Sequence, residues 1–112
     1  MGDFVSIVMP TFNGAKYIQA QIDSLINQSY QNYELIIIDD CSSDSTKEII
    51  QGYLNKDKRI RFYENNYNIG INKNFEKGIT LARGDVVFIC DQDDIWDENK
   101  IETMLAYLNK GY

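Results

Sequence analysis

The densest group of chemically useful side chains follows the last strongly apolar run of the sequence. Residues 86–90 are all apolar, and Asp91, Gln92, Asp93 and Asp94 come directly after them. Carboxylates this close repel one another unless a cation lies among them. Oxygen ligands suit Mg2+ or Mn2+, which keep water and phosphate oxygens in their other positions. The segment predicts a metal-bridged diphosphate site, with a polar loop that caps a helix at Asp97 as the alternative.

A second acidic group, Asp39-Asp40-Cys41-Ser42-Ser43-Asp44, follows the apolar residues 35–38. Adjacent strand residues point to opposite faces of a sheet, so Asp39 and Asp40 cannot share one role. One of them could accept a hydrogen bond from the imide N–H of uracil or thymine while the other anchors the loop. The alternative is a solvated turn in which Asp44 or Ser45 caps the next helix.

Two further segments carry polar groups at expected strand ends. Pro10-Thr11-Phe12-Asn13-Gly14 follows the first apolar run, and the Phe12 ring could stack on a flat base. Asn13 as a simple helix N-cap is the alternative. Later, Lys73 lies near an expected helix start and could reach a phosphate, although the asparagine-rich residues before it read equally well as an ordinary loop.

Composition excludes several classes of function. The 112 residues suit one compact domain, and 17 acidic against 11 basic side chains disfavour nucleic-acid binding. With no histidine there is no Ser-His-Asp triad and no imidazole metal site. The two cysteines lack CxxC spacing and read as reduced thiols. The lack of a leader and of any apolar run near ~18 residues predicts a cytoplasmic protein. Association of the full-length protein with the cytoplasmic face of a membrane is compatible with this location.

Apolar periodicity predicts the elements that must position these groups. Four short runs read as strands: residues 5–9, 35–38, 60–63 and 86–90. Three of them are nearly continuous in apolarity, which predicts strands covered on both faces. Helical spacing between and after them predicts four helices, the first over residues 15–27. The second has Ser45 and Glu48 in a capping box, and the third carries Phe75, Ile79 and Ala82 and ends at Gly84. The fourth has Asp97 as its cap and Glu98 in its first turn, and turns Ile101, Met104, Leu105 and Leu108 inward. The fold class is therefore α/β: a mostly parallel sheet of about four strands with helices on both faces.

Taken together, these motifs resemble the amino-terminal half of a family 2 glycosyltransferase with the Rossmann-like GT-A fold. Residues 5–13, residues 34–44, Asn68-Ile69-Gly70, and residues 82–85 leading into residues 91–96 carry the likeness. The Gln-Asp-Asp-Ile-Trp ending is similar to rhamnosyltransferase-like bacterial members that build surface polysaccharides.

The resemblance assigns roles to individual residues. It implies that Pro10, Thr11 and Phe12 line a nucleoside pocket, and that Asp40 reads the pyrimidine with Asp39 beside it. Asp91-Gln92-Asp93 stands at the DxD motif, with Asp91 toward the ribose and Asp93 on the metal. Many relatives carry an arginine where this chain has Phe75, which leaves Lys73 as the nearest cation.

The expected reaction is inverting transfer of a sugar from a UDP- or dTDP-linked donor to the hydroxyl of a glycan or lipid-linked saccharide. Family members place the acceptor site and the catalytic base after the DxD helix, so we expect the base beyond Tyr112, the last residue of this sequence. We therefore expect residues 1–112 to be the donor- and metal-binding part of a truncated chain that is inactive alone. Exposed apolar surface at the missing part could produce a homo-oligomer.

Two other classes of protein remain open at this stage. One is a phosphotransfer fold, either a phosphatase of the haloacid-dehalogenase type or a receiver domain, since both cluster aspartates at strand ends. The first needs its DxD after the first strand, where this chain has Pro-Thr-Phe-Asn. The other class is a non-catalytic nucleotide-binding or assembly module.

Overall fold

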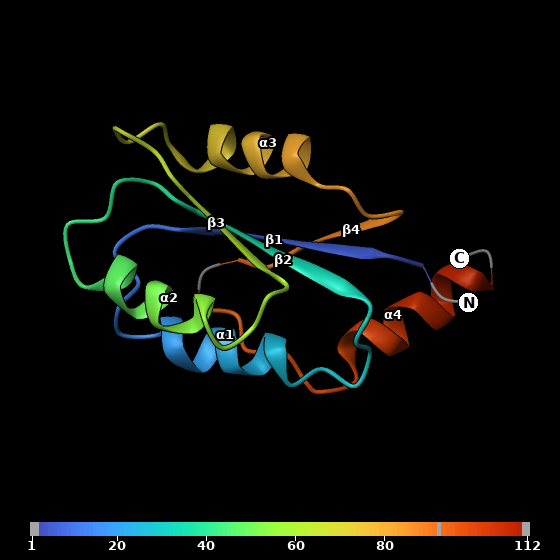
Figure 1. The fold of residues 1–112 in the computed structure, drawn as a ribbon. Coiled ribbons are helices and arrows are strands. Elements are labelled where there is room, and N and C mark those ends of the chain that lie inside the picture. Colours follow the sequence, from blue (N-terminus) through green and yellow to red (C-terminus); the bar gives the residue numbers. More distant parts are fainter. Residues whose placement is uncertain (1–2, 92, 111–112) are drawn as a thin grey trace.

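The computed structural model describes residues 3–91 and 93–110. Strands and helices alternate along the chain (Figure 1). The elements are β1 (Val5–Thr11), α1 (Ile18–Ile26), β2 (Tyr33–Asp39), α2 (Thr46–Leu54), β3 (Ile60–Glu64), α3 (Ile71–Leu81), β4 (Val86–Ile89) and α4 (Lys100–Asn109). None of the helices within these described ranges has the length and apolarity that a bilayer crossing requires.

The four strands form one parallel sheet in the order β3-β2-β1-β4. Helix α3 covers one face, while α1 and α2 lie against the other (Figure 1). Every parallel pair needs a crossover, and each crossover here contains a helix, which explains the alternation. The α/β fold class with helices on both faces is confirmed.

The hydrophobic core has two parts, one on each face of the sheet. The larger part packs β1 and β2 against α1, α2 and α4, with Ile7, Ile22 and Ile37 fully buried. The smaller part packs Val8 and Ile38 beneath α3. All residues of β1 and β2 are buried, as their continuous apolarity predicts.

The edge strand β4 departs from the predicted two-sided burial. Val87 and Ile89 are 38% and 41% exposed, because they point to the face of α3 but α3 lies over β1 and β2. Apolarity alone does not tell a central strand from an edge strand. Only the strand order does.

The first helix starts later than predicted, whereas the second starts directly after Ser45 as predicted but lacks the predicted side-chain cap. Helix α1 begins at Ile18 rather than residue 15, and its N-cap Tyr17 makes no side-chain capping bond, so Asn13 is not the N-cap. In α2, Ser45 makes no side-chain capping bond either. The Asp44 carboxylate accepts the Thr46 N–H at 3.0 Å instead, which was the alternative that the sequence left open.

The ends of the last two helices also differ from the prediction. Helix α3 stops at Leu81 with Ala82 as C-cap, and Gly84 has another purpose. A Cβ at Gly84 would lie 2.6 Å from the backbone nitrogen of Ser6, so the two segments approach too closely for a side chain. Helix α4 begins at Lys100 with Asn99 as N-cap, two residues after the predicted cap Asp97.

The inward faces of α3 and α4 are narrower than predicted. Ile79, Met104 and Leu108 are 50%, 43% and 44% exposed, whereas Ile101 and Leu105 are buried as expected. The buried positions of α3 include Asn74 and Gly78, two residues that a hydrophobic pattern cannot find. Asn74 is buried because its amide is hydrogen-bonded to Asn65 and to the Ile38 carbonyl, and Gly78 because it packs closely against Val8 and Ile38.

Candidate functional site

The strand order places the carboxyl ends of β1 and β2 side by side, and a pocket of about 360 Å³ opens there. Four of the predicted site residues line it: Pro10, Thr11, Phe12 and Asp40. The other lining residues come from the end of the β3–α3 loop and from α3: Asn68, Gly70, Ile71 and Asn74. The structure thus brings residues from three separate segments to one cavity at the sheet edge where ligands of parallel sheets bind.

The Asp40 carboxylate is nearly buried, at 3% exposure, and is held by three donors. Its Oδ1 accepts hydrogen bonds from the Ile69 N–H at 2.8 Å and the Asn65 amide at 2.9 Å. Its Oδ2 accepts the Gly70 N–H at 3.0 Å. Burial acts to raise the pKa of Asp40, but the hydrogen bonds outweigh burial and lower that pKa below its ordinary value. Asp40 is therefore a fixed, charged acceptor at neutral pH.

A network of buried side-chain amides, formed by Asn65 and Asn74, holds the donor that binds Asp40 Oδ1. The Asn65 amide also donates to Asn74 Oδ1 at 2.9 Å, and Asn74 Nδ2 donates to the Ile38 carbonyl at 2.8 Å. Lys77 Nζ donates to Asn65 Oδ1 at 2.6 Å. Every member of the network has a partner, so its orientation is well defined.

Asp39 points away from the pocket. It is fully buried and accepts Thr11 Oγ1 at 2.7 Å, Ser42 Oγ at 2.6 Å and the Ser42 N–H at 2.9 Å. These contacts tie the end of β1 to the loop after β2. Asp39 thus shapes the pocket by holding Thr11, and it is not one of the lining residues.

Asn13 and Lys73 also lie outside the pocket lining. Asn13 has a left-handed φ of 49°, and its Oδ1 accepts the Ser43 N–H at 2.8 Å, which joins the loops after β1 and β2. Lys73 is exposed in the first turn of α3.

The loop after β4 presents the two predicted metal ligands to solvent. Asp91 and Asp93 are exposed, and Asp93 adopts a left-handed φ of 75°. Neither carboxylate accepts a hydrogen bond from a residue that the structure describes, whereas Asp94 Oδ2 accepts the Trp96 Nε1–H at 3.0 Å. Asp94 therefore fixes the buried Trp96, and Asp91 and Asp93 remain available to a ligand.

Two positions named in the sequence predictions lie outside the described residues. One is Gln92, the middle residue of the predicted DxD motif. The other is Tyr112, beyond which the catalytic base is expected. The structure therefore tests neither the role of Gln92 nor the location of the base, and both stay predictions.

The donor set fits a hard divalent ion that shares its shell with a nucleotide. Within residues 3–91 and 93–110, no three acidic or cysteine side chains converge as a metal cage. Two carboxylates leave several positions for phosphate oxygens and water, which is how Mg2+ is usually held. The chemistry of Asp91 and Asp93 thus agrees with a metal that binds together with a diphosphate.

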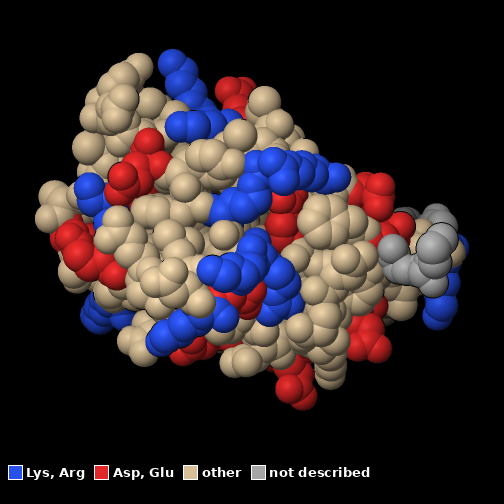
Figure 2. Space-filling view, in the orientation of Figure 1, with Lys and Arg blue, Asp and Glu red and all other residues tan. Residues whose placement is uncertain are grey.

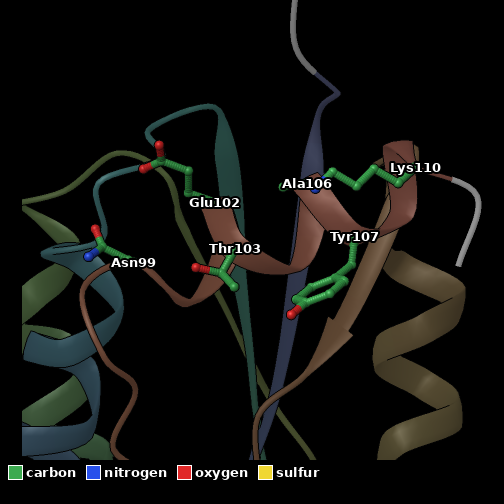
Figure 3. Close-up of a pocket in the computed structure, with 6 residues that line it drawn as sticks. All are labelled: Asn99, Glu102, Thr103, Ala106, Tyr107 and Lys110. Atoms are coloured by element: carbon green, nitrogen blue, oxygen red, sulfur yellow. The ribbon is translucent and has the colours of Figure 1, made fainter.

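A larger hollow, of about 530 Å³, lies elsewhere and lacks these features. Its lining comes only from α4 and the residues that flank it: Asn99, Glu102, Thr103, Ala106, Tyr107 and Lys110. Figure 3 shows these side chains spread along one helix rather than converging on a point. Convergent polar groups mark a binding site better than volume does, so the pocket at Asp40 is the candidate.

Charge on the face with the β3 edge is mixed rather than uniformly basic. Figure 2 shows Lys and Arg side chains interspersed with Asp and Glu. Arg61 pairs with Glu34 and Arg59 with Asp57, both at 2.7 Å. A positive charge that is already paired adds little to the attraction of an anion.

A parallel sheet with a pocket beyond its central strands defines the class of open α/β domains that bind ligands at the carboxyl ends of their strands. The family comparison is more specific. The chain belongs to glycosyl transferase family 2, whose family model matches residues 6–112. This finding does not favour the phosphotransfer alternative.

Curated relatives of this chain are glycosyltransferases. The putative teichuronic acid biosynthesis glycosyltransferase TuaG of Bacillus subtilis is 36% identical over 93% of this chain and 41% of its own length. The Escherichia coli UDP-Glc:alpha-D-GlcNAc-diphosphoundecaprenol beta-1,3-glucosyltransferase WfgD is 36% identical over 99% of this chain and 44% of its own. The chain spans less than half the length of these relatives.

Solved structures agree with the fold. Staphylococcus aureus TarS 1-349 in complex with UDP superposes with a TM-score of 0.87 and 28% identity, over 95% of this chain and 32% of that one. A Pyrobaculum calidifontis mannosyltransferase in complex with GDP-Man and Mn2+ shares the fold, with a TM-score of 0.79 and 23% identity. The predicted GT-A type of fold is confirmed.

Sequence reasoning missed the contribution of the β3–α3 segment to the pocket. The family resemblance used Asn68-Ile69-Gly70 as a motif but gave it no place in the site, and Asn74 read as part of a helix start. Asn74 carried a further signal, because it sits within a helix although asparagine is a weak helix former. Its hydrogen bonds to Asn65 and Ile38 explain the choice.

Proposed function

We propose that this chain is the donor-binding part of a metal-dependent, inverting glycosyltransferase that acts in bacterial surface polysaccharide synthesis. Its donor is a UDP- or dTDP-linked sugar, and its acceptor is the hydroxyl of a glycan or lipid-linked saccharide. Relatives whose names carry UDP-glucose, diphosphoundecaprenol and teichuronic acid support this choice. The proposed acceptor would bring the full-length protein to the cytoplasmic face of a membrane.

One observation carries the proposal: the Asp40 carboxylate lines a pocket beside Phe12 with one acceptor position unused. An ionised carboxylate has about four acceptor positions. Within residues 3–91 and 93–110, three are filled by Asn65, Ile69 and Gly70, which leaves one on Oδ2. A uracil or thymine imide offers one N–H, and the Phe12 ring offers a surface on which the flat base stacks.

Asp91 and Asp93 would hold the divalent ion, Mn2+ or Mg2+, together with the donor diphosphate. When bound, that ion supplies positive charge that offsets the charge on the departing diphosphate. The two side chains orient the diphosphate relative to the pocket, with Asp91 toward the ribose. Lys73 and Gln92 complete the proposed donor site in this assignment.

In the reaction, the acceptor oxygen forms a bond to the anomeric carbon as the bond from that carbon to the diphosphate breaks. A carboxylate base takes the hydroxyl proton. We assign this base and the acceptor site to sequence beyond Tyr112, because the relatives are more than twice as long as the matched part. These 112 residues alone should therefore bind the donor without transferring sugar.

The decisive experiment compares UDP with CDP in the full-length protein by calorimetry, with Mn2+ and with a chelator. The two ligands share ribose and diphosphate, but cytosine presents an acceptor where uracil presents the imide N–H. We expect UDP to bind at least about tenfold more tightly than CDP, a difference of about 1.4 kcal/mol. Equal affinities for UDP and CDP would refute recognition of the base by Asp40. UDP binding that is unchanged by the chelator would refute the proposed role of the metal ion.

Inversion and acceptor class need a separate measurement. The full-length protein, given the donor that binds and a lipid-linked saccharide, should form a product whose anomeric configuration is opposite to that of the donor. Nuclear magnetic resonance of the product reports this configuration. Retained configuration, or sugar transfer by residues 1–112 alone, would contradict the proposal.

A further inference from the structure

A stripe of polar side chains on α1 binds the segment that carries the proposed metal ligands. Gln21, Ser24 and Gln28 are spaced i, i+3 and i+7, so they lie on one face of the helix and its C-terminal extension. The described part of the segment between β4 and α4 contains neither helix nor strand. Figure 1 shows this segment passing alongside α1. Its backbone groups therefore depend on side chains for partners.

The far end of the segment is held by Ser24 and Gln28. Ser24 Oγ accepts the Trp96 N–H at 3.2 Å, and Gln28 Nε2 donates to the Asp97 carbonyl at 2.6 Å. Gln28 Oε1 accepts the N–H of Ile101, in the first turn of α4, at 3.1 Å. Both ends of the Gln28 amide are used, as a structural role requires.

Gln21 holds the near end, at Asp91. Its Nε2 donates to the Asp91 carbonyl at 2.6 Å and contacts Cys90 Sγ at 3.3 Å. The same carbonyl accepts the Asp94 N–H at 3.1 Å, which closes the turn that contains Asp93. Gln21 thus fixes the first residue of the turn from which both proposed metal ligands project.

Gln21 is poorly suited to a purely structural role. The side chain is fully buried, and its Oε1 is the buried side-chain atom without a hydrogen-bond partner among the described residues. A buried unpaired acceptor costs free energy, and the Asp91 carbonyl already has Asp94 as a donor. Methionine would fill the same space without that cost. An unpaired buried acceptor at such a position points to a functional demand.

We propose that Gln21 is a positioning residue for the donor site: by holding the Asp91 carbonyl, it sets Asp91 and Asp93 for a divalent ion and a diphosphate. This inference rests on the proposed function. The hydrogen bond also links α1, which follows the loop of Pro10 and Phe12, to the acidic loop. The hydrogen bond thereby fixes the position of the phosphate-binding loop relative to the base-binding loop.

The test compares Gln21→Met with Gln28→Met in the full-length protein. Gln28→Met is the matched control, since it leaves the Ile101 N–H without its acceptor and removes a contact to Asp97, which lies beyond the turn of the metal ligands. Gln21→Met should weaken Mn2+ binding in the presence of UDP at least about tenfold, change uridine affinity less than about twofold, and leave the thermal midpoint nearly unchanged. Gln28→Met should lower the midpoint and leave Mn2+ affinity unchanged.

Amide hydrogen exchange without metal or nucleotide gives a second readout that is independent of the proposed function. Gln21→Met should raise exchange of the Asp94 N–H at least about tenfold, because the turn at Asp91 loses its anchor. Unchanged exchange there, or equal loss of Mn2+ affinity in both variants, would overturn the inference. Gln21→Leu repeats the comparison should the methionine variant not fold. Wild-type protein that binds UDP without metal would instead overturn the proposed function, and the exchange result would still decide the role of Gln21 in the loop.

Discussion

Asp39 and Asp40 are neighbours in the chain, yet their carboxylates hold two different loops. Asp39 binds Thr11 and Ser42, which joins the loops after β1 and β2. Asp40 binds Ile69 and Gly70, which fixes the loop before α3. The alternation of side chains along a strand sends them to opposite faces of the sheet. One pair of acids thereby shapes both sides of the pocket.

The two positions should respond differently to replacement by asparagine. In Asp40→Asn, the new NH2 group must face a backbone N–H of Ile69 or Gly70, and neither can become an acceptor. In Asp39→Asn, the Thr11 and Ser42 hydroxyls can rotate and accept instead. We expect Asp40→Asn to lower the free energy of unfolding by about 2 kcal/mol and Asp39→Asn by less than about 1 kcal/mol.

Urea unfolding measures these losses, and calorimetry with UDP adds a functional comparison. Asp40→Asn should bind UDP at least about tenfold more weakly, whereas Asp39→Asn should stay within about threefold of wild type. The assignment of Asp40 to the base would be wrong if the order of the two variants were reversed.

The contribution of Asp40 to stability should depend on pH. Its pKa is lowered in the folded protein, so the folded state favours the charged form. That stabilisation is fully present above the unfolded pKa of about 3.9 and is lost as the pH falls through the lowered folded value. The stability gap between wild type and Asp40→Asn should therefore be constant from pH 7 to pH 5 and shrink below about pH 4. A gap that stays constant in acid would contradict the charged assignment.

Replacement by alanine should have a different effect at Asp93, a proposed metal ligand, than at the nearby Asp97. We expect Asp93→Ala to abolish Mn2+-dependent UDP binding in calorimetry, because it removes one of the two carboxylates proposed to hold the ion. Asp97→Ala is the control, since Asp97 is also exposed and acidic but lies beyond the turn. A chelator should reproduce the Asp93→Ala result in wild type. Unchanged affinity in Asp93→Ala would place the metal elsewhere.

Two helical glycines offer a matched test of packing. A Cβ at Gly78 would lie 2.2 Å from Val8 Cγ1 and 2.7 Å from Ile38 Cδ1, while nothing lies within 4 Å of a Cβ at Gly52. Gly78→Ala should lower the free energy of unfolding by about 1–2 kcal/mol, since overpacking exceeds the gain in helix propensity. Gly52→Ala should raise it by about 0.5–1 kcal/mol. Thermal or urea unfolding measures both, and stabilisation by both variants would refute the close packing of α3 on the sheet.

Local pattern was enough to predict the alternating α/β architecture, and the family resemblance of the motifs placed Pro10, Thr11, Phe12 and Asp40 at one site. The physical reason is that the carboxyl ends of parallel strands must meet at one edge of the sheet, so motifs that follow separate strands converge. Helix ends were less predictable. Asp44, rather than Ser45, satisfies the start of α2, because capping depends on the path of the preceding loop.

The tertiary structure alone decided which groups hold each of the two adjacent aspartates, that Asn74 supports Asp40 through Asn65, and that β4 is an edge strand with Val87 and Ile89 exposed. It also decided that Gln21 contacts Asp91, 70 residues away along the chain. Short-range patterns report periodicity and local hydrogen bonding. Contacts between distant segments depend on strand order and helix placement, which no local pattern contains.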